Sequence, residues 1–222
     1  MKLIKQMGCA AITLFYTSVT FAQALTSFDD QLLALQHEWA QANYSLEGDE
    51  QEKSFKLLIA NAKEFVMNNP ERAEPLVWYG IIESSFAGVD GGLSALSHAK
   101  KAKKSFEKAL KIDESVLEGS AYTSLGILYH KVPGWPISFG DDDDARILLE
   151  KAVSVNPDGI DPNYFYAEFL FDEREYEKAR RHLLLALDAP TRLERPLADK
   201  SRRAEVQSLL AKVETKINKK KT

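Results

Sequence analysis

The sequence predicts an all-α fold built from stacked pairs of helices, and three observations support this prediction. Beyond Ala24, apolar residues recur at intervals of three and four, the period of an amphipathic helix, and no segment alternates polar and apolar residues as a strand would. Pairs such as Asn69-Pro70 and Asn156-Pro157 interrupt this pattern and indicate helix ends, because a residue before proline avoids the α region. Short apolar motifs also recur along the chain, which indicates equivalent helix pairs.

The apolar periodicity and the proline positions together place the individual helices. In chain order we expect helices at residues 28–44, 50–68, 73–87, 97–112, 115–130, 142–155, 161–172, 174–188 and 196–217. Most of the connections between these helices are short. Residues 87–95 and 131–140 are long enough to be insertions.

The first 24 residues have the organisation of a secretory signal peptide. Lys2 and Lys5 form a positive start, a mostly apolar stretch follows, and Ala22-Gln23-Ala24 offers small residues at the positions that signal peptidase reads. We expect cleavage after Ala24 and a periplasmic mature protein. The alternatives are a segment that stays as a membrane anchor, or lipid attachment at Cys9. Cys9 lacks the usual signature for lipid attachment, because most of the apolar run follows it.

Composition and charge narrow the class of protein. The contents of 45% hydrophobic and 28% charged residues are ordinary for a soluble domain, and residues 25–222 suffice for one domain with its own core. The net charge of −4 argues against nucleic acid as the main partner. Because Cys9 is the only cysteine, the mature chain would have no disulfide, thiol nucleophile or cysteine-bound metal. We expect no membrane span after cleavage.

An apolar motif with constant spacing recurs three times. Each copy has a small residue, a large apolar residue four positions later and an alanine three positions after that, and each follows a small residue on the preceding helix. Small residues let two helix backbones approach, and the large residue fills the space beside them. The three copies are Ala102, Phe106 and Ala109 after Gly80; Ala145, Leu149 and Ala152 after Gly126; and Ala179, Leu183 and Ala186 after Ala167.

This motif resembles the tetratricopeptide repeat family. The match places recognisable repeats at about 73–114, 119–157 and 160–190, with insertions between the two helices of the first two repeats. The resemblance implies a right-handed solenoid of antiparallel helix pairs, closed by less typical capping helices such as residues 196–217. The chain is also similar to small exported bacterial repeat proteins. More loosely, it is similar to the T component of TRAP-type transporters that use a repeat protein.

The resemblance also implies which side chains line a concave groove. In this family, four positions of the first helix of each repeat face that groove. On this chain those positions are Glu74, Val77, Ile81, Ser84, Ser120, Thr123, Ile127, His130, Asp161, Tyr164, Glu168 and Phe171. The side chains that we expect to contact a partner or ligand are Thr123, Ile127, His130, Tyr164, Glu168 and Phe171.

The two insertions are expected to lie side by side on one rim, because stacked repeats place equivalent loops on one edge. Residues 87–95 are glycine-rich and should form a mobile loop. Residues 131–140 are stiffened by prolines and carry Trp135, Ile137 and Phe139. These apolar side chains either fold down over the core or form the lid of a binding pocket. The lid interpretation adds Trp135 and Phe139 to the candidate site.

Helix capping and solvent exposure explain the charged clusters more simply than metal binding or catalysis does. The four carboxylates of Asp141 to Asp144 point in different directions around one turn, so we expect Asp141 to cap a helix and the others to favour its dipole. The lysines between 100 and 111 should form a solvated face. The four histidines have no metal-ligand spacing, so we expect no metal.

The expected function is binding. The sequence contains no nucleophile elbow, phosphate-binding loop or metal-ligand cluster, so we expect neither an enzyme nor a cofactor. His130 and Glu168 could meet as an acid–base pair, but adjacent helices often offer such coincidences. The leading hypothesis is an exported interaction protein of the bacterial cell envelope that docks a protein in its groove. A homo-oligomer is an option that the sequence leaves open. The alternative is an accessory protein of TRAP-type solute uptake that binds a small ligand under the Trp135 loop.

Overall fold

The computed structural model describes residues 27–219, and in this range it contains nine α-helices and no strand. The predicted signal segment, its cleavage site and Cys9 lie outside the described residues, as do the last lysines of the tail. The helices are α1 (Phe28–Tyr44), α2 (Gly48–Asn68), α3 (Glu74–Asp90), α4 (Gly92–Ile112), α5 (Val116–Lys131), α6 (Asp142–Val155), α7 (Ile160–Asp172), α8 (Tyr176–Asp188) and α9 (Pro196–Lys219). None of these helices is long and apolar enough to cross a membrane.

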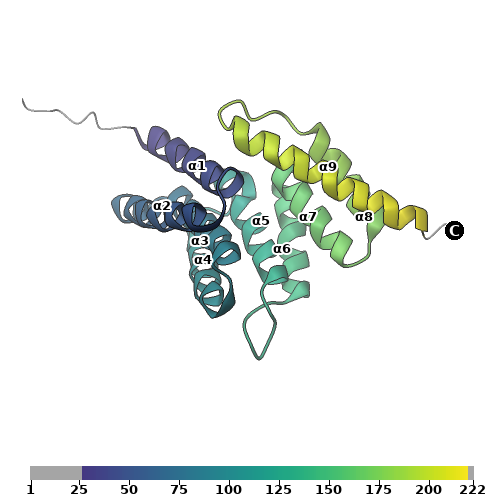
Figure 1. Ribbon diagram of the computed structural model, residues 1–222, viewed down its shortest axis with the longest axis horizontal. Coiled ribbons are helices and arrows are strands. Elements are labelled where there is room, and N and C mark those ends of the chain that lie inside the picture. The colour runs from purple at the N-terminus through teal and green to yellow at the C-terminus, as the bar shows by residue number, and fades with distance from the viewer. Residues whose placement is uncertain (1–26, 220–222) are drawn as a thin grey trace, which may run out of the picture.

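The helices stack as successive pairs, which confirms the predicted all-α solenoid. Helix α3 packs mainly on α4, α5 on α6 and α7 on α8, and the pairs follow one another across the molecule (Figure 1). Helices α1 and α2 precede the first recognisable pair. The predicted helix boundaries agree with the structure within a few residues, apart from the start of α4.

Small residues set the close contact within each pair, as the repeated motif predicts. A Cβ atom built on Gly80 would lie 2.5 Å from the ring of Phe106, which is fully buried. A Cβ atom on Gly126 would lie 2.8 Å from Cγ of Leu149. In the third pair, Ala167 lies in the same buried cluster as Leu183. The absence of a larger side chain at these points lets the paired backbones approach.

The expected mobile loop at residues 87–95 is wrong, because both flanking helices continue into it. Helix α3 extends to Asp90 and α4 begins at Gly92, so that Gly91 alone separates them. Gly91 and Gly92 have φ values of +67° and +59°, which glycine adopts without strain and which reverse the chain within two residues. The fully buried carboxylate of Glu83 also contacts His98, which ties α3 to α4.

The second insertion, Val132 to Gly140, forms an ordered hairpin that projects from the end of α5 (Figure 1). Phe139 packs on Tyr129, with ring centroids 5.5 Å apart, so this aromatic side chain covers the core as one interpretation predicted. Trp135 behaves differently, since 90% of it is exposed and it covers neither core nor cavity. After the hairpin, the carboxylate of Asp141 accepts a hydrogen bond from the amide of Asp144 at 3.0 Å, which confirms the predicted cap.

Helix α9 does more than cap the last pair. Its apolar side chains from Val206 to Ile217 pack on α8 within the C-terminal part of the core. Its first turn reaches the opposite end of the stack, where Ala198 joins the cluster that contains Trp39 and Trp78. The two ends of the solenoid therefore meet where α9 lies beside α1 (Figure 1). This contact closes one end of the concave face.

Two glycines of α3 allow a direct test of the close packing. We expect Gly80→Ala to lower the free energy of unfolding by about 1–3 kcal/mol, because the new methyl group meets the buried Phe106 ring. Gly88→Ala is the matched control, since nothing lies within 4 Å of its Cβ position and alanine favours the helix by up to ~1 kcal/mol. Urea unfolding measures both. Equal effects of the two substitutions would contradict the packing explanation.

Candidate functional site

A cavity of about 520 Å³ lies where α1, α3, α5 and α7 meet the segment that leads into α9. A smaller hollow of about 140 Å³ continues from it along the concave face. The residues that line both are Trp78, Ser120, Asp161, Arg192 and Arg195. The two spaces therefore form one recess, which α9 and the segment before it cover.

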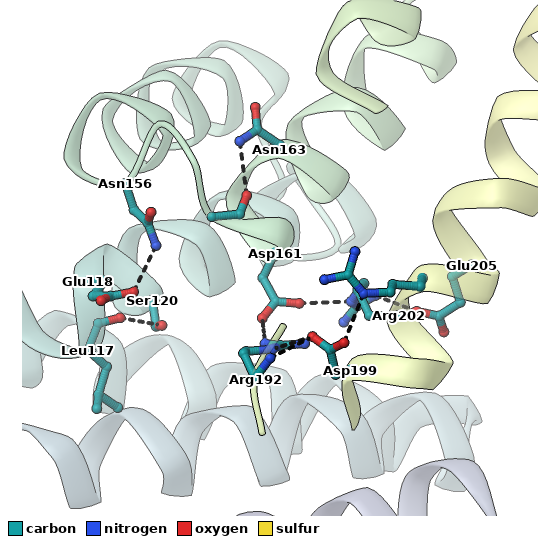
Figure 2. Close-up of polar contacts among 12 residues, drawn as sticks. Leu117, Glu118, Ser120, Asn156, Asp161, Asn163, Arg192, Asp199, Arg202 and Glu205 are labelled. Carbon is teal, nitrogen blue, oxygen red and sulfur yellow. Dashed lines mark hydrogen bonds and ion pairs between the residues drawn. The ribbon is translucent and has the colours of Figure 1, made fainter. Parts of the chain in front are cut away.

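Asp161 is the centre of the charged wall of this recess (Figure 2). Its carboxylate accepts a hydrogen bond from Nη1 of Arg192 at 2.5 Å and another from Nε of Arg202 at 2.8 Å. Burial would raise the pKa of Asp161, but the guanidinium groups of Arg202, Arg192 and Arg195 outweigh it and lower that pKa to about 2. One carboxylate in the first turn of α7 thus binds both α9 and the segment before it.

A second carboxylate fixes the segment from Ala189 to Arg195, which joins α8 to α9. Asp199 forms ion pairs with Arg192 at 3.3 Å and with Arg203 at 2.8 Å. Arg203 also donates hydrogen bonds to the carbonyl oxygens of Leu187 at 3.0 Å and Ala189 at 2.8 Å. These bonds hold the covering segment in place, although it has no regular structure of its own.

Arg202 is the most buried arginine of the cluster, with 8% of it exposed. Its guanidinium lies over the rings of Tyr164 and Phe165, 4.6 and 4.4 Å from their centroids, and donates a hydrogen bond to Glu205 at 2.6 Å. Burial lowers the pKa of Arg202, but Asp161 and its other neighbours outweigh burial and raise it. Arg202 therefore stays charged and joins α9 to α7 by stacking as well as by charge.

The opposite wall contains an unusual backbone turn. Leu117, Glu118 and Gly119 have φ values of 47°, 55° and 78°, so three successive residues at the start of α5 are left-handed. This conformation is unfavourable for leucine and glutamate and persists only where surrounding contacts enforce it. Here the carboxylate of Glu118 accepts a hydrogen bond from Nδ2 of Asn156 at 3.0 Å (Figure 2). The turn places Leu117 and Glu118 in the cavity wall.

Three of the sequence-predicted site residues lie at the recess. Thr123 and Ile127 line the smaller hollow, together with Ile81, Ser84, Ser120 and Asp161 from the predicted groove positions. Tyr164 stacks under Arg202 beside it. The groove positions given by the repeat register therefore line one common hollow at this end of the groove.

The other predicted residues lie toward the opposite end of α5, near the hairpin. His130 lies between the carboxylates of Asp142 and Asp172, 2.7 and 2.9 Å away. Glu168 pairs with Lys131 at 3.4 Å and not with His130, and Phe171 packs on Tyr176. Trp135 and Phe139 belong to the hairpin and line no part of the recess. In residues 27–219, no group of three or more His, Cys, Asp or Glu residues could hold a metal ion.

The sequence interpretation missed Trp78 and the arginines of the recess. Four arginines occur between residues 192 and 203, in TRLERPLADKSRR, which is a detectable cluster. The apolar pattern predicts only the capping helix at residues 196–217 in this part of the chain. Nothing in the local pattern indicates that this segment folds back over the concave face.

Comparison with known proteins shows no matching family model and no matching curated protein. Among solved structures, the chain is similar to the crystal structure of MamA, with a TM-score of 0.44 and 17% sequence identity. The similarity covers 77% of this chain and 93% of that one. The all-α class and the helix pairing follow from the helices of this chain and their packing.

The low pKa of Asp161 predicts how stability depends on pH. A carboxylate with a lowered folded-state pKa stabilises the fold above its unfolded-state pKa, and this contribution is lost as the pH falls from about 4 toward 2. We expect Asp161→Asn to reduce the free energy of unfolding at pH 7 by roughly 1.5–3 kcal/mol. As the pH falls from 4 to 2.5, the free energy of unfolding of the variant should also decrease less than that of the wild type.

Urea unfolding at pH 7, 4, 3 and 2.5 measures both effects. Asp188→Asn is the control, because Asp188 is an exposed residue at the end of α8. An acid profile of Asp161→Asn that matches the wild type would show that this carboxylate does not carry the acid sensitivity.

Proposed function

We propose that this chain is an exported helical-repeat interaction protein of the bacterial cell envelope, and that it acts by binding. The proposal rests on the stacked helix pairs together with an exposed apolar hairpin. Its export rests on the N-terminal segment of the sequence, with Lys2, Lys5 and the Ala22-Gln23-Ala24 site. A periplasmic location follows from that segment.

The exposed tip of the hairpin is the observation that carries this proposal. Trp135 is 90% exposed and Ile137 is 65% exposed, although large apolar side chains normally avoid water. Two backbone hydrogen bonds lie within the hairpin. The amide of Ile137 donates one to the carbonyl oxygen of Gly134 at 3.1 Å, and the amide of Gly140 donates the other to the carbonyl oxygen of Pro133 at 3.0 Å. A tryptophan on a preformed turn is typical of the side chains that dominate protein–protein binding.

Charged side chains surround the base of the hairpin. Lys131, the last residue of α5, pairs with Asp172 at 2.9 Å and with Glu168 at 3.4 Å. An apolar centre with a polar rim is the usual anatomy of an interface. Because α9 covers the other end of the concave face, we place the docking surface at the hairpin and not along the whole groove.

Photo-crosslinking tests this docking surface. We expect a benzoylphenylalanine residue at position 135 to give one discrete protein adduct in intact envelopes. The same residue at Leu57, which is 70% exposed on α2, is the control and should give no such adduct. The adduct at position 135 should decrease when Ile137→Ser is added. Identical crosslinking from both positions would contradict docking through the hairpin.

The recess supports a second candidate function, in which the protein holds a small ligand as an accessory of a solute uptake system. A cavity of about 520 Å³ falls within the range of small-molecule sites, roughly 300–1,000 Å³. This candidate replaces the ligand site expected under the Trp135 loop, because the recess lies at the other end of α5 from the hairpin.

A further inference from the structure

We infer that the recess binds a small organic monocarboxylate, with its charged group at Arg195. This inference rests on the second candidate function, that the recess holds a small ligand. It adds the chemical class of that ligand and the side chains that recognise it.

Arg195 differs from the other arginines of the recess. Arg192, Arg202 and Arg203 each form ion pairs with carboxylates of this chain. Within residues 27–219, the guanidinium of Arg195 forms neither an ion pair nor a side-chain hydrogen bond, and it lies over the ring of Trp78, 5.8 Å from the centroid. The chain therefore leaves one planar cation with its donors available in the cavity wall.

The surroundings of Arg195 favour an added anion. Burial lowers the pKa of Arg195, and the neighbouring charge of Arg192 lowers it further. Asp161, Asp199 and Glu118 act in the opposite direction, but each of them already accepts hydrogen bonds from other groups. A partly buried charge without a close partner is unfavourable, and a bound carboxylate would relieve this.

The ring of Trp78 lies in the same wall, beside Arg195. Trp78 is 3% exposed, and its indole N–H is enclosed by the protein with no acceptor among the described residues. By contrast, the indole N–H of Trp39 donates a hydrogen bond to Oγ of Ser85 at 2.9 Å. Because the N–H of Trp78 has no access to the open space of the cavity, Arg195 supplies the donors that a ligand can reach.

The rest of the lining limits what the ligand can be. The fork of a guanidinium matches the two oxygens of a carboxylate. Glu118 and Asp158 also line the cavity, and their negative charges disfavour a ligand that carries more than one negative charge. Several apolar residues could contact an uncharged body, namely Leu117, Ile160, Pro162, Ala189 and Pro190. These features together fit a monocarboxylate with an apolar body.

Calorimetric titration at pH 7 tests this assignment. The probes are hexanoate, 4-phenylbutyrate and indole-3-acetate, each compared with its primary amide, and inorganic phosphate as a separate anion. We expect at least one carboxylate to bind at least about tenfold more tightly than its amide, because the amide cannot pair with the charge. Arg195→Gln should weaken this binding by about tenfold or more.

Arg181→Gln, an exposed position on α8, is the control and should leave binding within about twofold of the wild type. Circular dichroism and urea unfolding establish that each variant folds. Equal binding of acid and amide would overturn the carboxylate assignment, and so would carboxylate binding that survives Arg195→Gln. Either result would leave the second candidate function, a cavity that holds a small ligand, in place. Arg195-dependent binding of phosphate alone would also overturn it. Failure of every probe with folded wild-type protein would overturn both this assignment and the second candidate function.

Discussion

The carboxylate of Asp161 joins three parts of the chain that are distant in sequence. It lies in the first turn of α7, where a negative charge is favoured, and it binds one arginine from the covering segment and one from α9. A stack of helix pairs alone would leave its concave face open at both ends. Because Asp161 holds Arg192 and Arg202, α9 crosses to α1 and one end of the face becomes a recess. The candidate ligand site exists only because this contact forms.

The same cluster leaves one arginine of the recess without a carboxylate partner among the described residues. The fold brings Arg192, Arg195, Arg202 and Arg203 close together and supplies carboxylates for three of them. Buried or partly buried charges favour a fold only when they are paired. Arg195 is the exception, and it lies beside the ring of Trp78. A guanidinium without a carboxylate in a cavity wall is better explained by recognition than by stability.

The sequence predicted the repeating part of the fold because that part depends on local rules. The period of apolar residues located the helices, and the spacing of Gly80 from Phe106 and of Gly126 from Leu149 predicted their pairing. Thr123 and Ile127, two groove positions given by the register of the repeat, line the smaller hollow. The closure of the recess could not be predicted in this way, because it depends on contacts between residues far apart in sequence. The positive φ values at Gly91 and Gly92 likewise shortened an expected loop into a turn.

The two candidate functions are physically compatible, because α5 separates their sites. Its regular helical part, residues 120–131, spans about 18 Å at 1.5 Å per residue. The left-handed turn at its start belongs to the recess, and the hairpin begins at its other end. A partner on Trp135 would therefore leave the recess uncovered, and a ligand at Arg195 would leave the hairpin free. Binding at one site does not exclude the other, so evidence for a docked protein would not count against a bound carboxylate.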